Sequence, residues 1–296
     1  MADPTGEARK ITVEDRVLEV LVTGPEDGPV VVFHTGTPSA GRPFAGWTRD
    51  GAQRGVRHVC YARPGYAGST RAPGRTVADC TADVAAIADA LGVERFHTVG
   101  WSGGGPHALA CAALLGERVI ATAVLAGVAP YDADGLNWLD GMGEENVEEF
   151  RATQAGAEAL RGFLEPFREE LSNISAADVA EAFGDLLSEV DRRALTGEFA
   201  EFMAASSAGA VENGIWGWLD DDLAFVADWG FELSAAAGPV SIWQGGQDRM
   251  VPFAHGRWLA ANIRGAAPHL REQEGHITIV VDAYGAVLDD LLARGA

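Results

Sequence analysis

The sequence is poor in cysteine, and it lacks any long apolar run. Its 296 residues include only three cysteines, Cys60, Cys80 and Cys111, which lie far apart and form no CxxC pair. This pattern argues against a disulfide-stapled scaffold and favours a reduced, intracellular chain. No stretch approaches the ~18 uninterrupted apolar residues of a membrane span, and residues 1–7 lack the apolar core of a secretory signal. We therefore expect a cytoplasmic location.

Basic residues are also scarce, which leaves the chain strongly acidic. Lys and Arg number 22 against 43 Asp and Glu, so the net charge is −21. Such a surface repels phosphate backbones and anionic lipid, and the scattered basic residues form no patch that would offset the repulsion. The expected partners are therefore a small-molecule ester, lactone or amide substrate, with no nucleic acid and no membrane. A homo-oligomer is compatible with this composition.

Strand and helix patterns alternate in the first and last parts of the chain. Strands are predicted at 10–13, 16–23, 30–33, 56–61, 96–100, 120–126, 240–244 and 268–272. Helices are predicted at 77–91, 106–115, 251–262 and 277–292. This alternation predicts the α/β class, with a mostly parallel eight-stranded sheet and helices on both faces.

The middle of the chain, residues 131–235, shows no strand pattern. Helices are predicted there at 144–155, 157–171, 176–188 and 191–208. We expect this stretch to form a helical cap inserted into a core that is made of residues 1–130 and 236–296. The run Asp220-Asp221-Asp222 is interpreted as a solvated helix start.

The strongest local signal is Gly100-Trp101-Ser102-Gly103-Gly104, which fits G-x-S-x-G between a predicted strand and a predicted helix. A serine on such a tight turn takes a strained backbone conformation, and the residues two positions away must lack side chains for the turn to close. Gly100 and Gly104 meet that need. On pattern alone, a glycine-rich turn with an incidental serine fits as well. The placement between strand and helix favours Ser102 as a nucleophile.

A serine nucleophile needs a base, and the base needs a carboxylate to orient it. In this type of fold the order along the chain is serine, acid, histidine. Asp248 follows the predicted strand 240–244 in a Gly-rich loop, and His276 lies between the last predicted strand and the last helix. Parallel strands present their carboxyl ends at one edge of the sheet, so Ser102, Asp248 and His276 are predicted to meet there as a catalytic triad.

Other interpretations of these residues remain open. Asp248 would also serve as the N-cap of the helix that follows it. Asp132 and Asp134 come after another strand and offer substitute acids. Of the seven histidines, only His276 follows a strand, an acid and a glycine in the required order.

Acyl transfer produces an oxyanion that two backbone N–H groups can stabilise. The amide of Gly103, directly after the nucleophile, is predicted to be one donor. The other is predicted to be Thr37, in the loop 34–38 after the third strand. Gly36 lets this loop turn away from the strand, whereas Pro38 has no N–H. A generic Gly-Pro turn is the alternative interpretation of the loop.

Motifs for cofactors and metals do not occur in the sequence. Gly36-x4-Gly41 is followed by Arg42-Pro43 rather than by Lys and Ser or Thr, so it is not a phosphate loop. Neither H-E-x-x-H nor a Cys/His metal spacing is present. We therefore expect neither a cofactor nor a metal.

Taken together, these motifs resemble the α/β-hydrolase family over nearly the whole chain, and most of all its small actinobacterial esterases and proline-iminopeptidase-like hydrolases with a helical cap. The resemblance rests on the loop 34–38, the segment 63–69, the Gly100–Gly104 turn, Asp248 and Gly275-His276. In the family the loop usually reads H-G-x-P, whereas here Thr35 separates His34 from Gly36. The resemblance implies a cofactor-independent hydrolase with a helical lid.

The reaction we expect is hydrolysis of a carboxylic ester or lactone through an acyl-enzyme. A proline-iminopeptidase-like aminopeptidase is one alternative, and a cofactor-free perhydrolase or C–C lyase on the same triad is another. A non-catalytic ligand receptor is a third, although the intact serine, acid and histidine argue against it.

The predicted substrate pocket lies above Ser102 and is largely apolar. Its candidate aromatic residues are Trp101, Trp138, Phe163, Phe167, Trp216 and Trp218. Packing of the cap on the core is the alternative role for each of them. A peptidase would also need carboxylates to bind a substrate ammonium group, for which the cap offers Glu144, Glu145, Glu148, Glu149, Glu212 and Asp220–Asp222. In so acidic a chain these residues are weak grounds for a peptidase, so ester hydrolysis is favoured.

Overall fold

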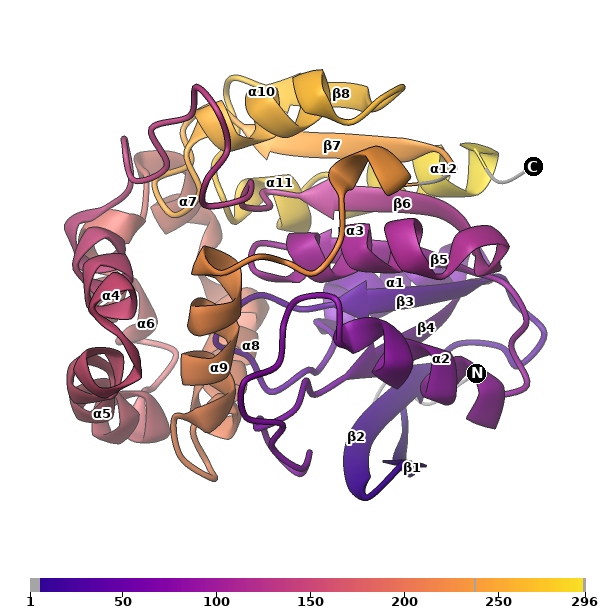
Figure 1. Cartoon of the computed structure of the whole chain (residues 1–296), viewed down its shortest axis with the longest axis horizontal. Helices are drawn as coiled ribbons and strands as arrows, with labels where there is room; N and C mark the ends of the chain where they lie inside the picture. The colour runs from indigo at the N-terminus through magenta and orange to yellow at the C-terminus, as the bar shows by residue number, and fades with distance from the viewer. Residues whose placement is uncertain (1–5, 237, 295–296) are drawn as a thin grey trace.

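An eight-stranded sheet forms the centre of the protein in the computed structural model, which describes residues 6–236 and 238–294 (Figure 1). The strand order is β1-β2-β4-β3-β5-β6-β7-β8. Only β1 with β2 and β2 with β4 pair antiparallel, and the other neighbours are parallel. The strands are β1 (Glu7–Val13), β2 (Arg16–Thr23), β3 (Val30–His34), β4 (Arg57–Tyr61), β5 (Phe96–Trp101), β6 (Val119–Leu125), β7 (Val240–Gly245) and β8 (Ala267–Arg271). The predicted fold class is confirmed. Residues 1–5, 237 and 295–296 of the predicted core lie outside the described residues.

Helices cover both faces of the sheet because the central strands are apolar on both sides. In β3, Val30 and Val32 pack into one apolar cluster, and Val31 and Phe33 pack into the other. The first cluster is closed by α2 (Cys80–Ala90), α3 (Gly104–Leu114) and α10 (Phe253–Asn262). The second cluster is closed by α1 (Ala45–Gln53), α11 (Thr278–Val281) and α12 (Tyr284–Arg294). Because successive side chains of a strand point to opposite faces of the sheet, one apolar run contributes to both clusters.

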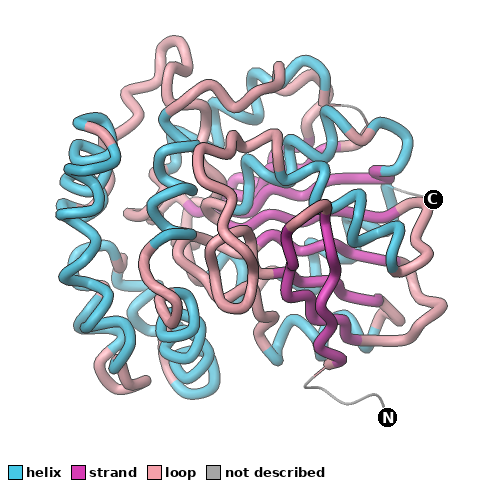
Figure 2. The backbone as a smooth tube through the Cα atoms, turned by 60° about the horizontal axis from the view of Figure 1, so that its bottom comes forward, coloured by secondary structure: helices cyan, strands magenta, loops and turns pink. Residues whose placement is uncertain are grey.

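A helical insertion lies between β6 and β7. Its helices are α4 (Glu144–Ala155), α5 (Ala157–Asn173), α6 (Val179–Ala182), α7 (Glu189–Ala194), α8 (Gly197–Ala210) and α9 (Trp216–Val226). Figure 1 shows these helices in the left half of the view, beyond the carboxyl ends of the parallel strands, and Figure 2 shows the same side of the sheet covered by helices. The edge of the sheet that carries the predicted site residues therefore faces this insertion.

Three predicted helices differ from those observed. The helix expected at 176–188 shrinks to α6 and a short 3-10 turn. The one expected at 191–208 is divided into α7 and α8, because Thr196 is extended and Gly197 takes a φ of 53°. The last one, expected at 277–292, is divided into α11 and α12. In each case the apolar residues keep a helical spacing across a point where the backbone leaves the helical conformation, so the spacing predicts one helix where the structure has two segments.

The prediction that Asp220-Asp221-Asp222 forms a solvated helix start is wrong. The three residues lie inside α9 and are 3%, 0% and 1% exposed. Helix α9 lies between the sheet and helices α4 and α5, so it is buried on several sides (Figure 1). Acidic side chains survive there because Asp220 and Asp221 are paired with arginines.

The structure also describes the cysteines and the helix lengths that the sequence analysis considered. The three cysteines are free and buried. Over residues 6–236 and 238–294, no helix is both long enough and apolar enough to cross a membrane.

Candidate active site

Ser102 occupies a strained turn between β5 and α3. Its φ is 55°, in the left-handed region that residues other than glycine seldom adopt. The turn is held from both sides, because the Ser102 N–H donates to the Leu125 carbonyl at 2.9 Å and the Gly105 N–H donates to the Ser102 carbonyl at 2.9 Å. The backbone therefore fixes the serine where the strand ends.

The glycines on either side of Ser102 are required by close backbone contacts. A Cβ on Gly100 would lie 2.2 Å from the carbonyl oxygen of Gly104. A Cβ on Gly104 would lie 2.1 Å from the carbonyl oxygen of His34, at the end of β3. No side chain can occupy either position without moving a strand, which is the requirement that the G-x-S-x-G pattern predicts.

His276 and Asp248 form a buried pair at the ends of β8 and β7. The His276 Nδ1 atom is 2.8 Å from Asp248 Oδ2, and the two residues are 2% and 5% exposed. Gln244 Nε2 also donates to Asp248 Oδ2, at 3.0 Å. The other carboxylate oxygen, Oδ1, accepts the backbone N–H groups of Met250 and Val251. Asp248 thus both shapes the turn before α10 and orients the imidazole.

Burial and charge act in opposite directions on the pKa of His276. Burial alone lowers it, but the neighbouring Asp248 carboxylate and its hydrogen bond raise it more, so the net pKa lies above the ordinary 6.5. The alternative acids do not share this position, because Asp132 and Asp134 are exposed. His255 is a buried histidine with structural partners, since its Nδ1 accepts the Ala129 N–H at 3.1 Å and its Nε2 donates to the Trp138 carbonyl oxygen at 2.8 Å.

The loop that carries His276 is held by Asp191 of the insertion, a residue that the sequence did not single out. Asp191 accepts the backbone N–H groups of His276, Ile277 and Thr278 at 2.8–3.1 Å. A Cβ on Gly275 would lie 2.2 Å from Asp191 Oδ2, so that position must also be glycine. The Ser188-x-x-Asp191 spacing signals a helix start, but nothing in it identifies this distant contact.

The loop after β3 lies beside the serine turn. A Cβ on Gly36 would be 3.4 Å from Ser102 Cβ. A Cβ on Gly103 would be only 2.4 Å from Thr37 Oγ1. Gly103 therefore lies directly against the side chain of Thr37, the other predicted oxyanion donor.

A buried arginine holds this loop in place. Arg63, which follows β4, donates to the carbonyl oxygens of Thr35 at 2.6 Å and Gly36 at 2.9 Å, and to Thr37 Oγ1 at 2.9 Å. It is 2% exposed and reaches Asp221 Oδ2 at 2.6 Å. One guanidinium thus ties three consecutive loop residues to helix α9.

Asp221, on helix α9 of the insertion, binds the same loop and its neighbours. Its Oδ2 accepts the hydroxyl groups of Thr37 at 2.8 Å and Tyr66 at 2.9 Å. Arg75 also lies 2.7 Å from its Oδ1. Burial raises the pKa of this carboxyl, but Arg63 and Arg75 lower it more, so the net pKa lies well below its usual range. We call Arg63, Arg75 and Asp221, with the Thr37 and Tyr66 hydroxyls, the loop anchor.

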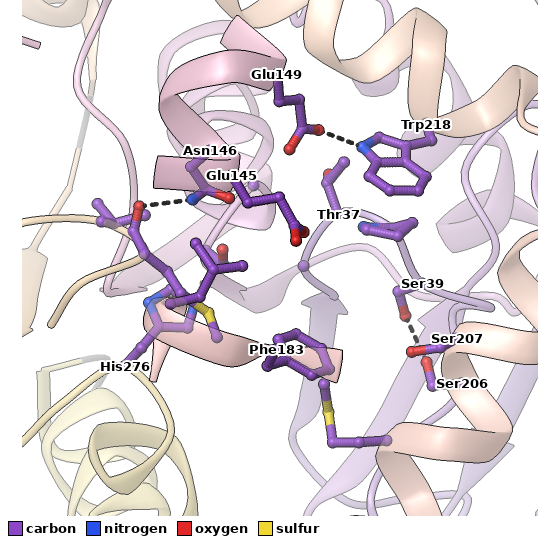
Figure 3. A pocket seen from close by; sticks show the side chains of 18 of the residues that line it. Thr37, Ser39, Glu145, Asn146, Glu149, Phe183, Ser206, Ser207, Trp218 and His276 are labelled. Atoms are coloured by element: carbon purple, nitrogen blue, oxygen red, sulfur yellow. Dashed lines mark hydrogen bonds between the residues drawn. The ribbon is translucent and has the colours of Figure 1, made fainter. Parts of the chain in front are cut away.

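Between the sheet edge and the insertion lies a cavity of about 140 Å³ (Figure 3). It exceeds by an order of magnitude the roughly 10–15 Å³ that one water molecule needs, so it admits a small organic molecule. Residues from the core that line it include Thr37, Ser102, Gly103 and His276.

The predicted aromatic pocket is found only in part. Trp101, Phe167 and Trp218 line the cavity. Trp138 does not, because it packs on Phe150 and donates to the Ala129 carbonyl. Trp216 lies outside as well, 37% exposed and covered by the guanidinium of Arg71, and Phe163 packs on Phe167. The prediction for Trp138 and Trp216 is therefore wrong, since hydrophobicity alone does not tell which face of the insertion a tryptophan joins.

Comparison with known proteins agrees with this geometry. The family model described as alpha/beta hydrolase fold matches residues 29–283. Over 109 residues the chain is 30% identical to an uncharacterized hydrolase, YcgS, from Bacillus subtilis (strain 168), a match that spans 37% of each of the two chains. Among solved structures it is similar to a bromoperoxidase from Bacillus anthracis, with 20% identity over 97% of this chain and 100% of the other and a TM-score of 0.71. An esterase from Exiguobacterium antarcticum aligns over 98% and 99% of the two chains, with 18% identity and a TM-score of 0.67.

The fold and the family match define an enzyme of the hydrolase type. The chain belongs to the alpha/beta hydrolase fold family.

Proposed function

We propose that the protein is a serine hydrolase that cleaves a carboxylic ester or lactone through an acyl-enzyme. The observation that carries this proposal is the buried His276–Asp248 pair, whose histidine lines the same cavity as Ser102 on its strained turn. The solved esterase with the same fold supports the same reaction class.

In the first half of the reaction, Ser102 Oγ attacks the substrate carbonyl carbon. His276 Nε2 takes the hydroxyl proton, while Asp248 holds Nδ1–H and stabilises the imidazolium that forms. The tetrahedral intermediate collapses when the C–O bond to the leaving alcohol breaks, and the imidazolium returns its proton to that oxygen. The acyl group remains on Ser102 as an ester.

The negative oxygen of the tetrahedral intermediate would be held by the N–H groups of Gly103 and Thr37. Donors of this kind contribute about 3 kcal/mol each to transition-state stabilisation. The loop anchor matters for the second donor, because Arg63 binds the Gly36 carbonyl directly before Thr37, and Arg63 and Asp221 both bind the Thr37 hydroxyl. In the second half of the reaction, His276 takes a proton from a water molecule whose oxygen attacks the carbonyl carbon of the acyl-enzyme. The carboxylic acid is released when the bond to Ser102 Oγ breaks and that oxygen regains a proton from His276.

We expect kcat/KM for a neutral ester to fall at acid pH with a midpoint above 6.5. Only neutral His276 can accept the serine proton, and the pKa of this histidine is raised, so activity is present above that pKa and is lost as pH falls through it. Asp248→Asn removes the charge that raises the pKa. The variant should lose about 10⁴-fold in kcat, and its midpoint should move to lower pH. A wild-type midpoint at or below 6.5 in the pH profile of kcat/KM would contradict this role.

We also expect clear activity on short-chain p-nitrophenyl esters and little on prolyl p-nitroanilide. Amide cleavage needs a stronger protonation of the leaving group than ester cleavage, and among the described residues the charges that raise the pKa of His276 are those of Asp248 and Asp191. Both substrates release a coloured product, so the same assay gives kcat/KM for each, with Ser102→Ala as the background control. A higher kcat/KM for the anilide would replace the esterase assignment with a peptidase.

A further inference from the structure

The wall that the insertion contributes to the cavity carries acidic side chains. Four carboxyl groups line it, Glu145 and Glu149 from α4, Glu170 from α5 and Asp222 from α9. Among the lining residues that the structure describes, none is Arg or Lys. Figure 3 shows Glu145 and Glu149 extending into the cavity from neighbouring turns of one helix. The other carboxylates considered from the sequence, Glu144, Glu148, Glu212, Asp220 and Asp221, do not line it.

Two of these carboxyl groups, Glu149 and Asp222, form a buried pair. The residues are 7% and 1% exposed. Glu149 accepts a hydrogen bond from the indole N–H of Trp218. Asp222 Oδ2 is buried without a hydrogen-bond partner among the described residues. A buried carboxylate oxygen with no donor is costly, so this pair calls for either a proton or a cation between its members.

The electrostatics of the pair agree with that requirement. Burial first, and then the neighbouring Glu149, raise the pKa of Asp222 well above its usual range. Arg75 acts in the opposite direction on the pKa of Asp222, but its ion pair is with Asp221, at 2.7 Å. Glu145 adds further negative charge beside the pair, and its pKa is raised to about 7 by burial and by Glu149. With no ligand bound, the pair therefore holds one shared proton and one negative charge.

We propose that Glu149 and Asp222, with Glu145 beside them, bind the ammonium group of an amine-bearing acyl substrate whose carbonyl reaches Ser102. This inference rests on the proposed function, and it adds the substrate class. The ammonium group takes the place of the shared proton, which leaves to solvent, and its N–H groups donate to Glu149 and to the unpartnered Asp222 Oδ2.

An ammonium group suits this site better than a metal ion. Over the described residues, no three His, Cys, Asp or Glu side chains are grouped so as to hold a metal, and hard cations take six or more oxygen ligands. A primary ammonium group needs only three acceptors. The net charge of −21 also raises the local concentration of cationic ligands around the protein.

Matched esters that differ in one group test the proposal. The benzyl ester of alanine and benzyl isobutyrate have nearly the same shape, because one carries an ammonium group where the other carries a methyl group. The β-alanine and butyrate esters form a second such pair that places the amine one atom further from the carbonyl. We expect kcat/KM, followed as benzyl alcohol released, to favour the amine in at least one pair by at least about tenfold, the value of a charge-assisted hydrogen bond.

The Glu149→Gln/Asp222→Asn double variant keeps the shape of the site but removes its charge, so it should lose this preference. Glu148→Gln is the matched control, since Glu148 is the exposed neighbour of Glu149 on α4, and it should retain the preference. A preference that survives in the double variant, or one that is lost in Glu148→Gln, would overturn the inference.

A binding measurement separates this inference from the proposed function. Calorimetric titration of the Ser102→Ala protein with each ester measures affinity without turnover. The amine-bearing ester of at least one pair should bind at least about tenfold more tightly than its neutral partner. Equal affinities in both pairs overturn the ammonium site whatever the catalytic result. Failure of the wild-type protein to hydrolyse any ester, with the affinity difference intact, would instead overturn the proposed function alone.

Discussion

Replacing Ser102 with alanine is expected to lower kcat for ester hydrolysis by about 10⁴-fold or more, while KM changes little. The serine oxygen forms the bond that defines the acyl-enzyme, so its loss removes the chemical step and leaves substrate binding in place. The position tolerates alanine, because the cavity next to Ser102 is already open and the turn is held by backbone hydrogen bonds. Steady-state kinetics on p-nitrophenyl butyrate, with melting temperature as a check on folding, measure the effect.

The loss of activity in Ser102→Ala and the loss in His276→Ala should not be additive. His276→Ala alone should cost about as much as Ser102→Ala, and the double variant should be little worse than either, because the two side chains act as one unit. If Ser102→Ala kept ester hydrolysis near the wild-type rate, the assignment of the nucleophile would be wrong. Separate, multiplicative losses for the two residues would argue that they do not share a proton transfer.

Replacing Asp221 with asparagine should have the second-largest effect, and it should act on both stability and rate. The carboxylate is fully buried between Arg63 and Arg75. Removing one partner of such a group leaves buried charge uncompensated, which costs about 3–5 kcal/mol and corresponds to roughly 10 °C in melting temperature. Because Thr37 also loses its anchor, kcat should fall by up to about 100-fold with KM little changed.

An exposed ion pair of similar geometry provides the control. Asp289 meets Arg54 through two hydrogen bonds of 2.6 and 2.8 Å, but its side chain is 64% exposed. Asp289→Asn should therefore change stability by no more than about 1 kcal/mol and leave kcat unchanged. Thermal unfolding and kinetics below the melting temperature compare the two variants. Equal effects would mean that the loop anchor contributes no more than a surface contact.

The signals that can be read from the sequence are those that lie close together along the chain. The serine turn needs only five residues, and two of its glycines are required by contacts within the turn and with the neighbouring strand. Asp248 and His276 could be placed because parallel strands end at one edge, so strand order along the chain already implies proximity. The five central strands, β3 to β7, follow from short apolar runs that are buried on both faces.

The parts that escaped prediction depend on contacts between distant residues. Arg63 and Asp221 are 158 positions apart, and no local pattern distinguishes Asp221 from an acid on a solvated helix face. The packing of the insertion is equally hard to predict. Its helices bury apolar side chains against different elements on different sides, and the sequence does not say which side meets which element. Trp216 and Trp218 are two positions apart on α9, yet one faces outward and the other lines the cavity.

The most direct test of the central claim is the site of covalent labelling by a fluorophosphonate. The reagent should add one phosphonyl group per chain, displacing fluoride, and peptide mapping by mass spectrometry should place it on Ser102. Labelling should be abolished in Ser102→Ala and should slow strongly in His276→Ala, because the serine must lose its proton to attack. An unlabelled wild-type protein, or an adduct on any residue other than Ser102, would contradict the account.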